Sequence, residues 1–580
     1  MKIKGLDKCC IAIPDPDEVL QAGALNEMSC RKKWKPDGTG VNILFFEPNV
    51  HAFTYLRNLF PDATYDAPAE QHREKCREQI RKTNFLLTEK TKELGQLQDI
   101  NFEGVFKTEP FEHQLKILRL SCLLPYYALF CEQGTGKTKI VIDNVAYLKM
   151  LGQIEALFIL TLNGVHANWV KEELPTHMSD NVPYEAALWY STPRADEKKQ
   201  LLNVCETPYN GKLKVLAMNI DAVNHERGYE YVQAFLQKHR CFFTMDEGLL
   251  IKTPGSGRTK ATLQLGKLAP FKRLLNGTPI TQGMEDLYAQ FSFLSESILG
   301  FSSYYTFKNQ HCVIDTNQTR TNRSYDLVVG YKNVDELLRK VDAFSYRVTK
   351  EECLDLPERT YRKRFVRLTP AQRKWYDAVK EELVVKITRD KTLTVKNVLS
   401  EMVRLRQIVG GFLPTDDGEL LAIDDTPPKL TLLLEEIALN KTYQGIIWAA
   451  FTAEVDLIAS KLKVPTYQGS TPRDIKEAMK VDFQAGNLQW FVATSPNQPT
   501  GAGIGITLNK ARSVYHYSNV YSYAMRCQMD DRAHRSGQLN KVTYTDLVAQ
   551  DTIDEPIIKA LRSKRELASA VTKDELLAWL

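Results

Sequence analysis

Short apolar runs separated by stretches of helical periodicity dominate the middle of this 580-residue chain. Residues 156–161, 214–218 and 241–245 are β-rich runs that alternate with amphipathic helical stretches. This alternation predicts a parallel sheet whose strands are joined by crossover helices. The same texture returns nearer the C-terminus, in runs at 445–449, 490–494, 513–517 and 542–548. We therefore expect two successive α/β domains.

The first hundred residues have a different texture. Residues 42–47 predict a buried strand, and apolar residues at helical spacing follow it: Phe53, Leu56, Leu59 and Phe60. In residues 70–98, Lys and Arg alternate with Glu, a pattern typical of a solvated helical arm. We expect a small α/β accessory domain over residues 1–106.

The segment between the two sheets looks mostly helical from about 300 to 410, and residues 414–428 are rich in turn formers. The expected organisation has four parts. They are an N-terminal domain at 1–106, a first α/β lobe at 107–300, a helical insertion and linker at 301–427, and a second lobe with a C-terminal brace at 428–580.

Composition narrows the class of protein only a little. Lys and Arg number 76 against 71 Asp and Glu, an excess of five that does not by itself indicate nucleic-acid binding. The 11 cysteines form no CxxC pair, as is usual in a reducing compartment. No apolar run approaches roughly 18 residues, and the N-terminus lacks a signal peptide's apolar segment. We expect a soluble intracellular protein with no membrane partner.

Candidate chemistry begins directly after the apolar run at 127–131. Glycines in such a loop let backbone N–H groups approach phosphates, Lys137 would reach the β/γ oxygens, and the Thr138 hydroxyl would serve Mg²⁺. Cys131 stands where the usual motif has its first Gly. A plain glycine-rich turn is the alternative, and it leaves Lys137 unexplained. The expected nucleotide-binding residues of the loop are Gln133, Gly134, Thr135, Gly136, Lys137 and Thr138.

An acidic pair, Asp246 and Glu247, directly follows the apolar run at 241–245. Ligands bind at the C-terminal ends of strands in parallel sheets. Asp246 would hold Mg²⁺ through water, and Glu247 would polarise the attacking water. A solvated turn is the ordinary alternative for two carboxylates after a strand.

Far downstream, residues 528–538 carry Gln528 and two arginines, Arg532 and Arg535. On a helix, residues three apart share one face, so both guanidiniums could reach one γ-phosphate as arginine fingers. Neither half of the site is complete alone. A nucleotide site divided between two lobes would open and close with its ligand.

Weaker signals accompany these motifs. The turn at 276–279 could couple phosphates to the second lobe or be an ordinary tight turn. Glycines at 500–507 could contact phosphate or serve packing. Gln114, close to Phe111, could read adenine, although a lone Gln is more often ordinary surface.

The order of these motifs resembles superfamily 2 helicase-like ATPases, and specifically their Snf2 branch. The general motifs are at 111–114, 132–138, 156–169, 246–252, 276–279, 500–508 and 528–538. Features particular to Snf2 proteins are at 251–252, 347–350, 356–357, 405–408, 531–538 and 552–555. The resemblance covers residues 107–565. It departs from the family at Gly248-Leu249, usually Ala-His, at Asn276, usually Thr or Ser, and at Thr507, often Asn.

The resemblance implies an α/β fold with two RecA-like parallel-sheet lobes and helical insertions, preceded by the small N-terminal domain. It implies ATP and Mg²⁺ as cofactors, with Gln114 and Gln528 at the nucleotide. The expected activity is a DNA-stimulated ATPase that translocates on double-stranded DNA and remodels forks or four-way junctions in replication, recombination or repair. The cytoplasm of a bacterial or phage-infected cell is the expected location.

Alternatives remain within this resemblance. The motor could remove proteins from DNA, or the chain could be an ATP-switched binding module with little turnover. An RNA helicase is a further alternative, which the Snf2-type motifs disfavour. Residues 1–106 could recognise branched DNA or act as a scaffold.

Overall fold

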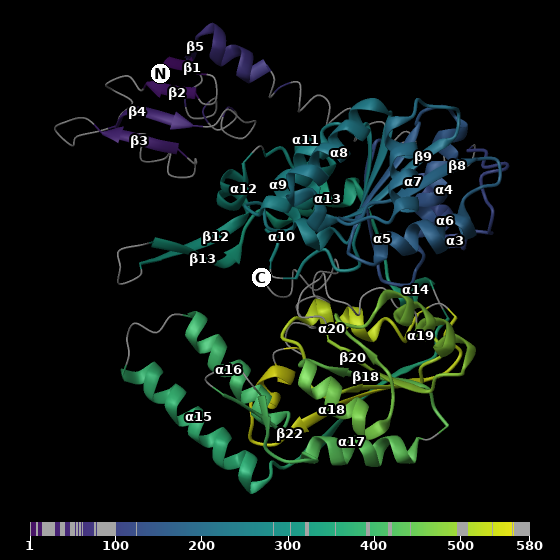
Figure 1. The fold of residues 1–580 in the computed structure, drawn as a ribbon. Helices are drawn as coiled ribbons and strands as arrows, with labels where there is room; N and C mark the ends of the chain where they lie inside the picture. The colour runs from purple at the N-terminus through teal and green to yellow at the C-terminus, as the bar shows by residue number, and fades with distance from the viewer. Residues whose placement is uncertain are drawn as a thin grey trace.

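The computed structural model describes most of the chain. In the N-terminal part it describes residues 2–6, 10–13, 30–34, 41–46, 53, 56, 60, 62–74 and 77. From residue 100 to residue 561 it describes all but 123, 282, 302, 319–323, 354, 390–394, 416–419, 441, 496–507, 536 and 560. Within this part of the chain, a small N-terminal sheet is followed by two larger parallel sheets, which form an upper and a lower lobe in Figure 1.

The N-terminal sheet has the order β3-β4-β2-β1-β5. Its strands are β1 (Lys2–Gly5), β2 (Cys10–Ile13), β3 (Cys30–Trp34), β4 (Val41–Phe46) and β5 (Thr64–Tyr65). The strand expected at 42–47 corresponds to β4. Asp66 Oδ1 accepts hydrogen bonds from the backbone N–H groups of Gly5 and Ala69, each at 2.9 Å, which ties the helical residues 67–74 to β1. Most of the expected charged arm, residues 78–99, lies outside the described residues.

The first lobe contains a seven-stranded sheet in the order β14-β6-β11-β10-β7-β9-β8, and every pairing in it is parallel. The strands are β6 (Tyr126–Cys131), β7 (Ala156–Thr161), β8 (Tyr184–Leu188), β9 (Leu213–Asn219), β10 (Cys241–Asp246), β11 (Phe271–Leu275) and β14 (Ser345–Val348). Helices cover both faces: α3 (Glu112–Ser121), α4 (Lys137–Met150), α5 (Val165–Asn168), α6 (Leu174–His177), α7 (Ala195–Glu206), α8 (Glu226–Lys238), α9 (Gly257–Gly266), α10 (Asp286–Leu294), α11 (Glu296–Leu299), α12 (Tyr304–His311) and α13 (Val334–Ala343).

Burial on both faces explains why the strands of this lobe are continuous apolar runs. Successive side chains of a strand point to opposite faces of the sheet. In β7, Phe158 and Leu160 belong to one apolar cluster, whereas Leu157 and Ile159 belong to the cluster on the other face. A strand covered by helices on both sides therefore shows no polar alternation.

The second lobe contains a six-stranded sheet, also fully parallel, in the order β15-β22-β21-β18-β20-β19. The strands are β15 (Arg359–Val366), β18 (Gly445–Ala449), β19 (Thr466–Tyr467), β20 (Trp490–Thr494), β21 (Ser513–His516) and β22 (Val542–Ala549). Its helices are α17 (Pro428–Leu439), α18 (Thr452–Leu462), α19 (Arg473–Ala485) and α20 (Tyr523–Asp530). The expected α/β fold with two parallel sheets is confirmed.

The segment between the lobes differs from the mostly helical insertion expected from the sequence. It supplies an edge strand to each large sheet, β14 to the first and β15 to the second, with the short helix α14 (Lys350–Cys353) between them. An edge strand is covered on fewer sides than a central one, so β15 reads Arg-Thr-Tyr-Arg-Lys-Arg-Phe-Val and lacks an apolar run. The sequence pattern therefore concealed both strands.

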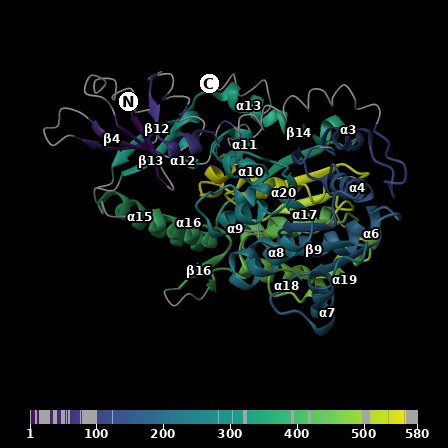
Figure 2. The ribbon, with the colours of Figure 1, turned by 90° about the horizontal axis from the view of Figure 1, so that it is seen from above.

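Two extensions project from the lobes on the same side in both views (Figures 1 and 2). From the first lobe comes the antiparallel hairpin of β12 (Cys312–Gln318) and β13 (Ser324–Tyr331). From the second comes the helix pair α15 (Pro370–Arg389) and α16 (Val395–Val409), followed by the small hairpin of β16 (Phe412–Pro414) and β17 (Leu420–Ala422). Across the residues that the structure describes, no helix combines the length and apolar character that a membrane crossing requires.

Candidate active site

The strand order of the first lobe brings three sequence motifs together. β6, β11 and β10 are neighbours, and all three run parallel. The glycine-rich loop follows β6, the turn at 276–279 follows β11, and the acidic pair ends β10. Because the carboxyl ends of parallel strands meet at one edge of a sheet, these segments converge on one site.

The glycine-rich loop has the backbone shape that a phosphate site requires. Gly134 and Gly136 have φ angles of 85° and 87°, in the left-handed region that favours glycine. Helix α4 begins directly after them at Lys137, so its unpaired N–H groups and positive dipole end face the loop. Lys137 Nζ donates to the carbonyl oxygens of Cys131 at 2.7 Å and Glu132 at 3.2 Å. The ammonium group therefore lies within the curve of the loop.

Gln114 lies beneath this loop and braces its backbone. Its Nε2 donates to the Thr135 carbonyl at 3.1 Å, and its Oε1 accepts from the Phe111 N–H at 3.0 Å. A Cβ at Gly136 would lie 2.0 Å from Gln114 Nε2, so only glycine fits there. His113 Nε2 forms a hydrogen bond with the same Thr135 carbonyl at 2.8 Å, a contact that the sequence did not suggest. Both polar atoms of the Gln114 amide are therefore hydrogen-bonded to the backbone. The neighbouring Phe111 has an exposed aromatic ring.

Asp246 is oriented by two donors from neighbouring elements. Its Oδ2 accepts from Trp169 Nε1 at 2.9 Å and from Thr161 Oγ1 at 3.3 Å. Trp169 is buried and opens the π-helix η2 (Trp169–Glu173). Such π segments are rare and occur frequently at functional sites. Thr161 and Trp169 both lie in the motif at 156–169, but sequence reasoning assigned neither of them a role.

Glu247 has an unusual backbone and an unusual acidity. Its φ of 66° places a non-glycine residue in the left-handed region, which costs on the order of 1–3 kcal/mol. Burial, with the Asp246 carboxylate next to it, raises the pKa of Glu247 to about 7, while Lys137 and Arg532 act in the opposite direction. A carboxyl group that titrates near neutral pH suits a general base.

The donor set around the loop suits a magnesium ion carried with a nucleotide. The Thr138 hydroxyl and the Asp246 carboxylate are hard oxygen donors, and Mg²⁺ is commonly held by one or two protein oxygens together with phosphate oxygens and water. In the described part of the chain, no group of three or more His, Cys, Asp or Glu side chains is placed to hold a metal ion. The hydrogen bonds on Asp246 Oδ2 fix the orientation of the carboxylate that would serve this ion.

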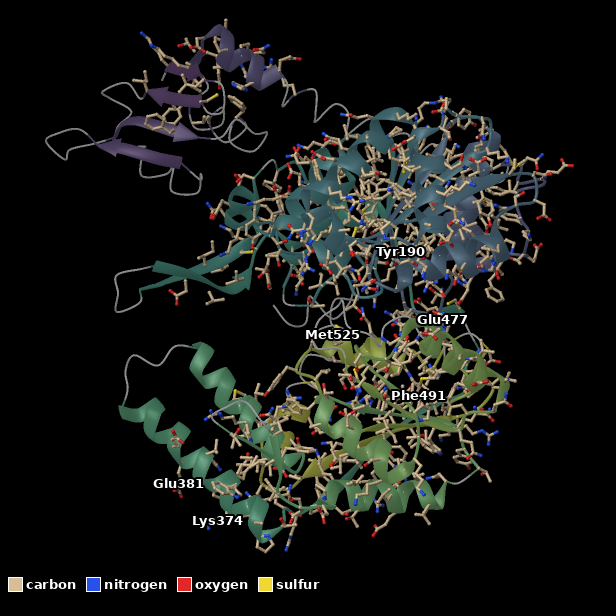
Figure 3. The ribbon with its side chains drawn as sticks, in the orientation of Figure 1. Tyr190, Lys374, Glu381, Glu477, Phe491 and Met525 are labelled. Carbon is tan, nitrogen blue, oxygen red and sulfur yellow. The ribbon has the colours of Figure 1, made fainter. Side chains whose placement is uncertain are left out.

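The second lobe reaches this site through the end of α20. Figure 3 shows Met525 from α20 and Glu477 from α19 on the side of the second lobe that faces the first, where Tyr190 is labelled. One turn of α20 beyond Met525, Gln528 Nε2 donates to Glu247 Oε1 at 2.9 Å. This hydrogen bond joins two residues that the sequence placed in separate halves of one site.

Arg532 and Arg535 do not share a helical face, which corrects the expectation from their spacing. Helix α20 ends at Asp530, and both arginines lie in the turn that follows. Leu508 N–H donates to the Arg532 carbonyl at 2.9 Å, and Gln538 Nε2 donates to the Ala533 carbonyl at 3.0 Å. These bonds to groups outside the helix replace the helical pattern and shape the turn.

Both arginines nevertheless lie in the electrostatic field of the first lobe. Burial lowers the pKa of Arg532 to about 10, and the neighbouring Arg535 acts in the same direction while Glu247 opposes it. Burial also lowers the pKa of Arg535, opposed chiefly by Glu173 of η2. A carboxylate of the first lobe thus favours the charged form of each guanidinium, Glu247 for Arg532 and Glu173 for Arg535.

Lys350 connects the glycine-rich loop to this turn, a role that sequence reasoning did not identify. Its backbone N–H donates to Glu132 Oε2 at 3.0 Å. Its buried Nζ donates to the His534 carbonyl at 2.9 Å and forms an ion pair with Asp531. The residue begins α14, directly after edge strand β14. The glycine-rich segment at 500–507 lies outside the described residues.

The first parallel sheet carries the glycine-rich loop and the Asp246-Glu247 pair, and the second lobe brings Gln528, Arg532 and Arg535 to them. This arrangement defines a two-lobed α/β protein of the helicase-like class. The SNF2-related domain matches residues 113–410, and the helicase conserved C-terminal domain matches residues 428–537. The chain belongs to the SNF2 family. The resemblance inferred from the sequence motifs is thereby confirmed.

Individual relatives are distant. An uncharacterised ATP-dependent helicase of Mycoplasma genitalium is 23% identical over 63% of this chain and 33% of its own length. The ATP-dependent helicase FUN30 of Saccharomyces cerevisiae is 22% identical over 79% of this chain and 45% of its own length. A solved SWI2/SNF2 ATPase core from Sulfolobus solfataricus in complex with double-stranded DNA is 22% identical, covering 82% of this chain and 96% of that one, with a TM-score of 0.35.

The chain spans about a third to a half of the length of the curated relatives it matches. Their names describe ATP-dependent helicases and SNF2 proteins, including a regulator of chromatin.

Proposed function

We propose that this chain is a DNA-stimulated ATPase that hydrolyses ATP with Mg²⁺ between its two lobes and translocates on double-stranded DNA. The observation that carries the proposal is the hydrogen bond from Gln528 of the second lobe to Glu247 of the first. Through it, the segment that bears the arginine fingers contacts the residue best suited to activate water. Hydrolysis is then linked to the relative position of the lobes, as a motor requires.

The hydrolytic roles follow from the geometry of the site. Lys137 and the N–H groups of the glycine-rich loop bind the β and γ phosphates, and Thr138 with Asp246 would hold the magnesium ion that neutralises them. Glu247 orients and deprotonates the attacking water. Arg532 and Arg535, the contribution of the second lobe, offset the negative charge that develops on the transferred phosphoryl group.

We further propose branched DNA, either forks or four-way junctions, as the preferred substrate in replication, recombination or repair. Backbone tracking is independent of sequence and depends on local basic groups, so the modest net charge of +5 does not argue against it. The separate N-terminal sheet, outside both large sheets, supports a role in recognising the branch. The two extensions that project on one side of the lobes offer further surface to a long ligand.

Steady-state ATP hydrolysis at fixed salt tests the proposal, with no nucleic acid, linear duplex, a four-way junction, a model fork, single strands and RNA. Strong stimulation by fork or junction supports branch remodelling. Equal stimulation by linear duplex favours a general translocase, including a motor that removes proteins from DNA. Stimulation by RNA alone contradicts the proposal. The absence of any stimulation also contradicts it and favours an ATP-switched binding module. Lys137→Ala is the control that should abolish turnover without unfolding the protein.

A further inference from the structure

Gln290, on α10, hydrogen-bonds to the turn that follows β11 through both ends of its side-chain amide. Its Oε1 accepts from Asn276 Nδ2 at 2.9 Å, and its Nε2 donates to the carbonyls of Pro279 at 2.7 Å and Asp286 at 2.8 Å. Asn276 Oδ1 in turn accepts from the Thr278 N–H at 3.0 Å. Gln290 and Asn276 are both fully buried, so breaking these bonds would strand polar groups away from water.

The same amide packs against the loop that carries Glu247. A Cβ at Gly248 would lie 3.0 Å from Gln290 Oε1 and 2.9 Å from Leu274 Cδ1. Contacts this short require a neighbour to move, and Gln290 is fixed by its three hydrogen bonds. The glycine next to Glu247 therefore leaves room for Gln290, and the backbone of this loop lies against the Gln290 amide.

A second set of contacts joins the segment after Glu247 to the turn after β11, at a position one helical turn before Gln290 on α10. Lys252 Nζ donates to Thr281 Oγ1 at 2.9 Å and lies 3.9 Å from Asp286 Oδ2. Asp286 Oδ2 also accepts from the N–H of Thr281 at 2.8 Å. Asp286 and Gln290 are four residues apart, so they lie on one face of α10 and hold the turn at both of its ends.

We propose that Gln290 is the positioning residue that couples the Glu247 loop to the Asn276 turn, and so couples nucleotide state to DNA-dependent turnover. The inference rests on the proposed function. Three positions that depart from the family fit together here: Gly248 admits Gln290, Asn276 pairs with it, and Leu249 brings no polar group that could do so. The amide of α10 thereby hydrogen-bonds to the Asn276 turn and packs against the loop that carries Glu247.

The coupled unit also reaches the phosphate loop. The Cβ position of Gly277, beside Asn276, lies 3.5 Å from the backbone nitrogen and Cγ of Gln133. A buried, fully bonded polar network resists partial rearrangement, so the turn and the Glu247 loop shift together. Nucleotide-dependent movement in either the loop or the acidic pair is thus passed to the turn.

The test compares Gln290→Leu, Asn276→Ala and the double variant with the wild type, using basal and DNA-stimulated kcat. We expect basal kcat within about threefold of wild type in Gln290→Leu. The stimulation ratio should be at least about tenfold lower in both single variants, with the double variant no worse than either. Gln200→Leu, on the exposed face of α7, is the matched control. An unchanged ratio, equal loss of basal and stimulated turnover, or additive losses would each overturn the proposal.

A second measurement stays informative if DNA does not stimulate the wild type, which would be a failure of the proposed function alone. Hydrogen exchange of residues 276–281 is compared with and without ADP and aluminium fluoride, in wild type and in Gln290→Leu. If Gln290 couples the two segments, the exchange rate of residues 276–281 changes with nucleotide in the wild type but not in Gln290→Leu. The exchange rate of residues 133–145 should respond to nucleotide in both proteins. The same nucleotide response of residues 276–281 in both proteins would overturn the proposed coupling through Gln290.

Discussion

Gln528 Nε2 donates to Glu247 Oε1 at 2.9 Å, and this bond links α20 of the second lobe to the end of β10 in the first. The two residues are 281 positions apart in the sequence. Glu247 is strained in its backbone and has a pKa raised to about 7, so its carboxyl group is sensitive to a single donor. In this structure, a side chain of the second lobe therefore contacts a carboxyl group whose pKa burial raises.

Replacing Gln528 should slow hydrolysis more than it weakens nucleotide binding. A hydrogen bond to a charged group is worth about 1.5–3 kcal/mol, so Gln528→Ala should lower kcat by about 10- to 100-fold with a small change in KM. Gln528→Glu should be at least as slow, because it places a second carboxyl beside Glu247. Steady-state kinetics with Gln200→Ala as the exposed control measures this effect. Wild-type kcat in Gln528→Ala would show that the contact has no part in turnover.

Lys350 should be required both for stability and for turnover. Its Nζ is buried and paired with Asp531, so Lys350→Met leaves a carboxylate without its partner, a change that costs about 3–5 kcal/mol for a buried pair. The free energy of unfolding, measured with denaturant, and kcat should both fall in Lys350→Met. The double variant Lys350→Met with Asp531→Leu should recover the free energy of unfolding but not kcat. Lys198→Met, on the exposed side of α7, is the control. Recovery of kcat in the double variant would mean that Lys350 acts only as a structural residue.

The acidic pair and the glycine-rich loop were predictable because each directly follows a strand that is buried on both faces. β6 and β10 are unbroken apolar runs, so their C-terminal ends were visible in the sequence. What the sequence did not reveal is the strand order that places β11 between them. That order is set by crossover connections and packing rather than by any local pattern.

The missed residues share a physical reason. Trp169, Lys350 and Gln290 act through contacts with residues 77, 181 and 14 positions away. The motifs at 156–169 and 347–350 include the first two, but no local pattern named the partners of any of the three. The spacing of Arg532 and Arg535 suggested a helix, but the turn after α20 is stabilised by Leu508 and Gln538, which are remote from it in the sequence or beyond its end. Local patterns predicted the elements, and tertiary contacts determined the site.

Replacing Trp169 should raise the Mg²⁺ concentration that nucleotide binding requires. Trp169→Phe keeps an aromatic ring in the buried pocket but removes the N–H that Asp246 Oδ2 accepts. Loss of a donor that orients a metal-binding carboxylate typically costs about 10- to 100-fold in metal affinity or activity. We expect about a tenfold higher Mg²⁺ concentration for half-maximal binding of a fluorescent ATP analogue.

Trp448→Phe is the matched control, because Trp448 is fully buried and its Nε1 has no hydrogen-bond partner among the described residues. The control should leave the magnesium dependence unchanged. Equal magnesium requirements in Trp169→Phe and wild type would show that Asp246 does not depend on this donor.

His311 should make the stability of the first lobe fall in mild acid. The side chain is fully buried against Phe301 and Phe307, with ring centroids 5.5 Å and 5.0 Å away. Burial lowers the pKa of His311 from 6.5 to about 4, with Glu336 opposing and Lys340 reinforcing the shift. Between these two values the unfolded chain binds more protons than the folded one, so stability is lost as pH falls through this window.

Thermal unfolding followed from pH 7 to pH 4 tests this linkage. The wild-type Tm should decline over the window, by about 2–4 °C for each kcal/mol lost, and the decline should be smaller in His311→Phe, whose ring fills the aromatic pocket without titrating. His225→Gln, at an exposed position before α8, should follow the wild type. Parallel curves for wild type and His311→Phe would show that other groups carry the acid sensitivity, because the phenyl ring cannot take up a proton at any pH in the window.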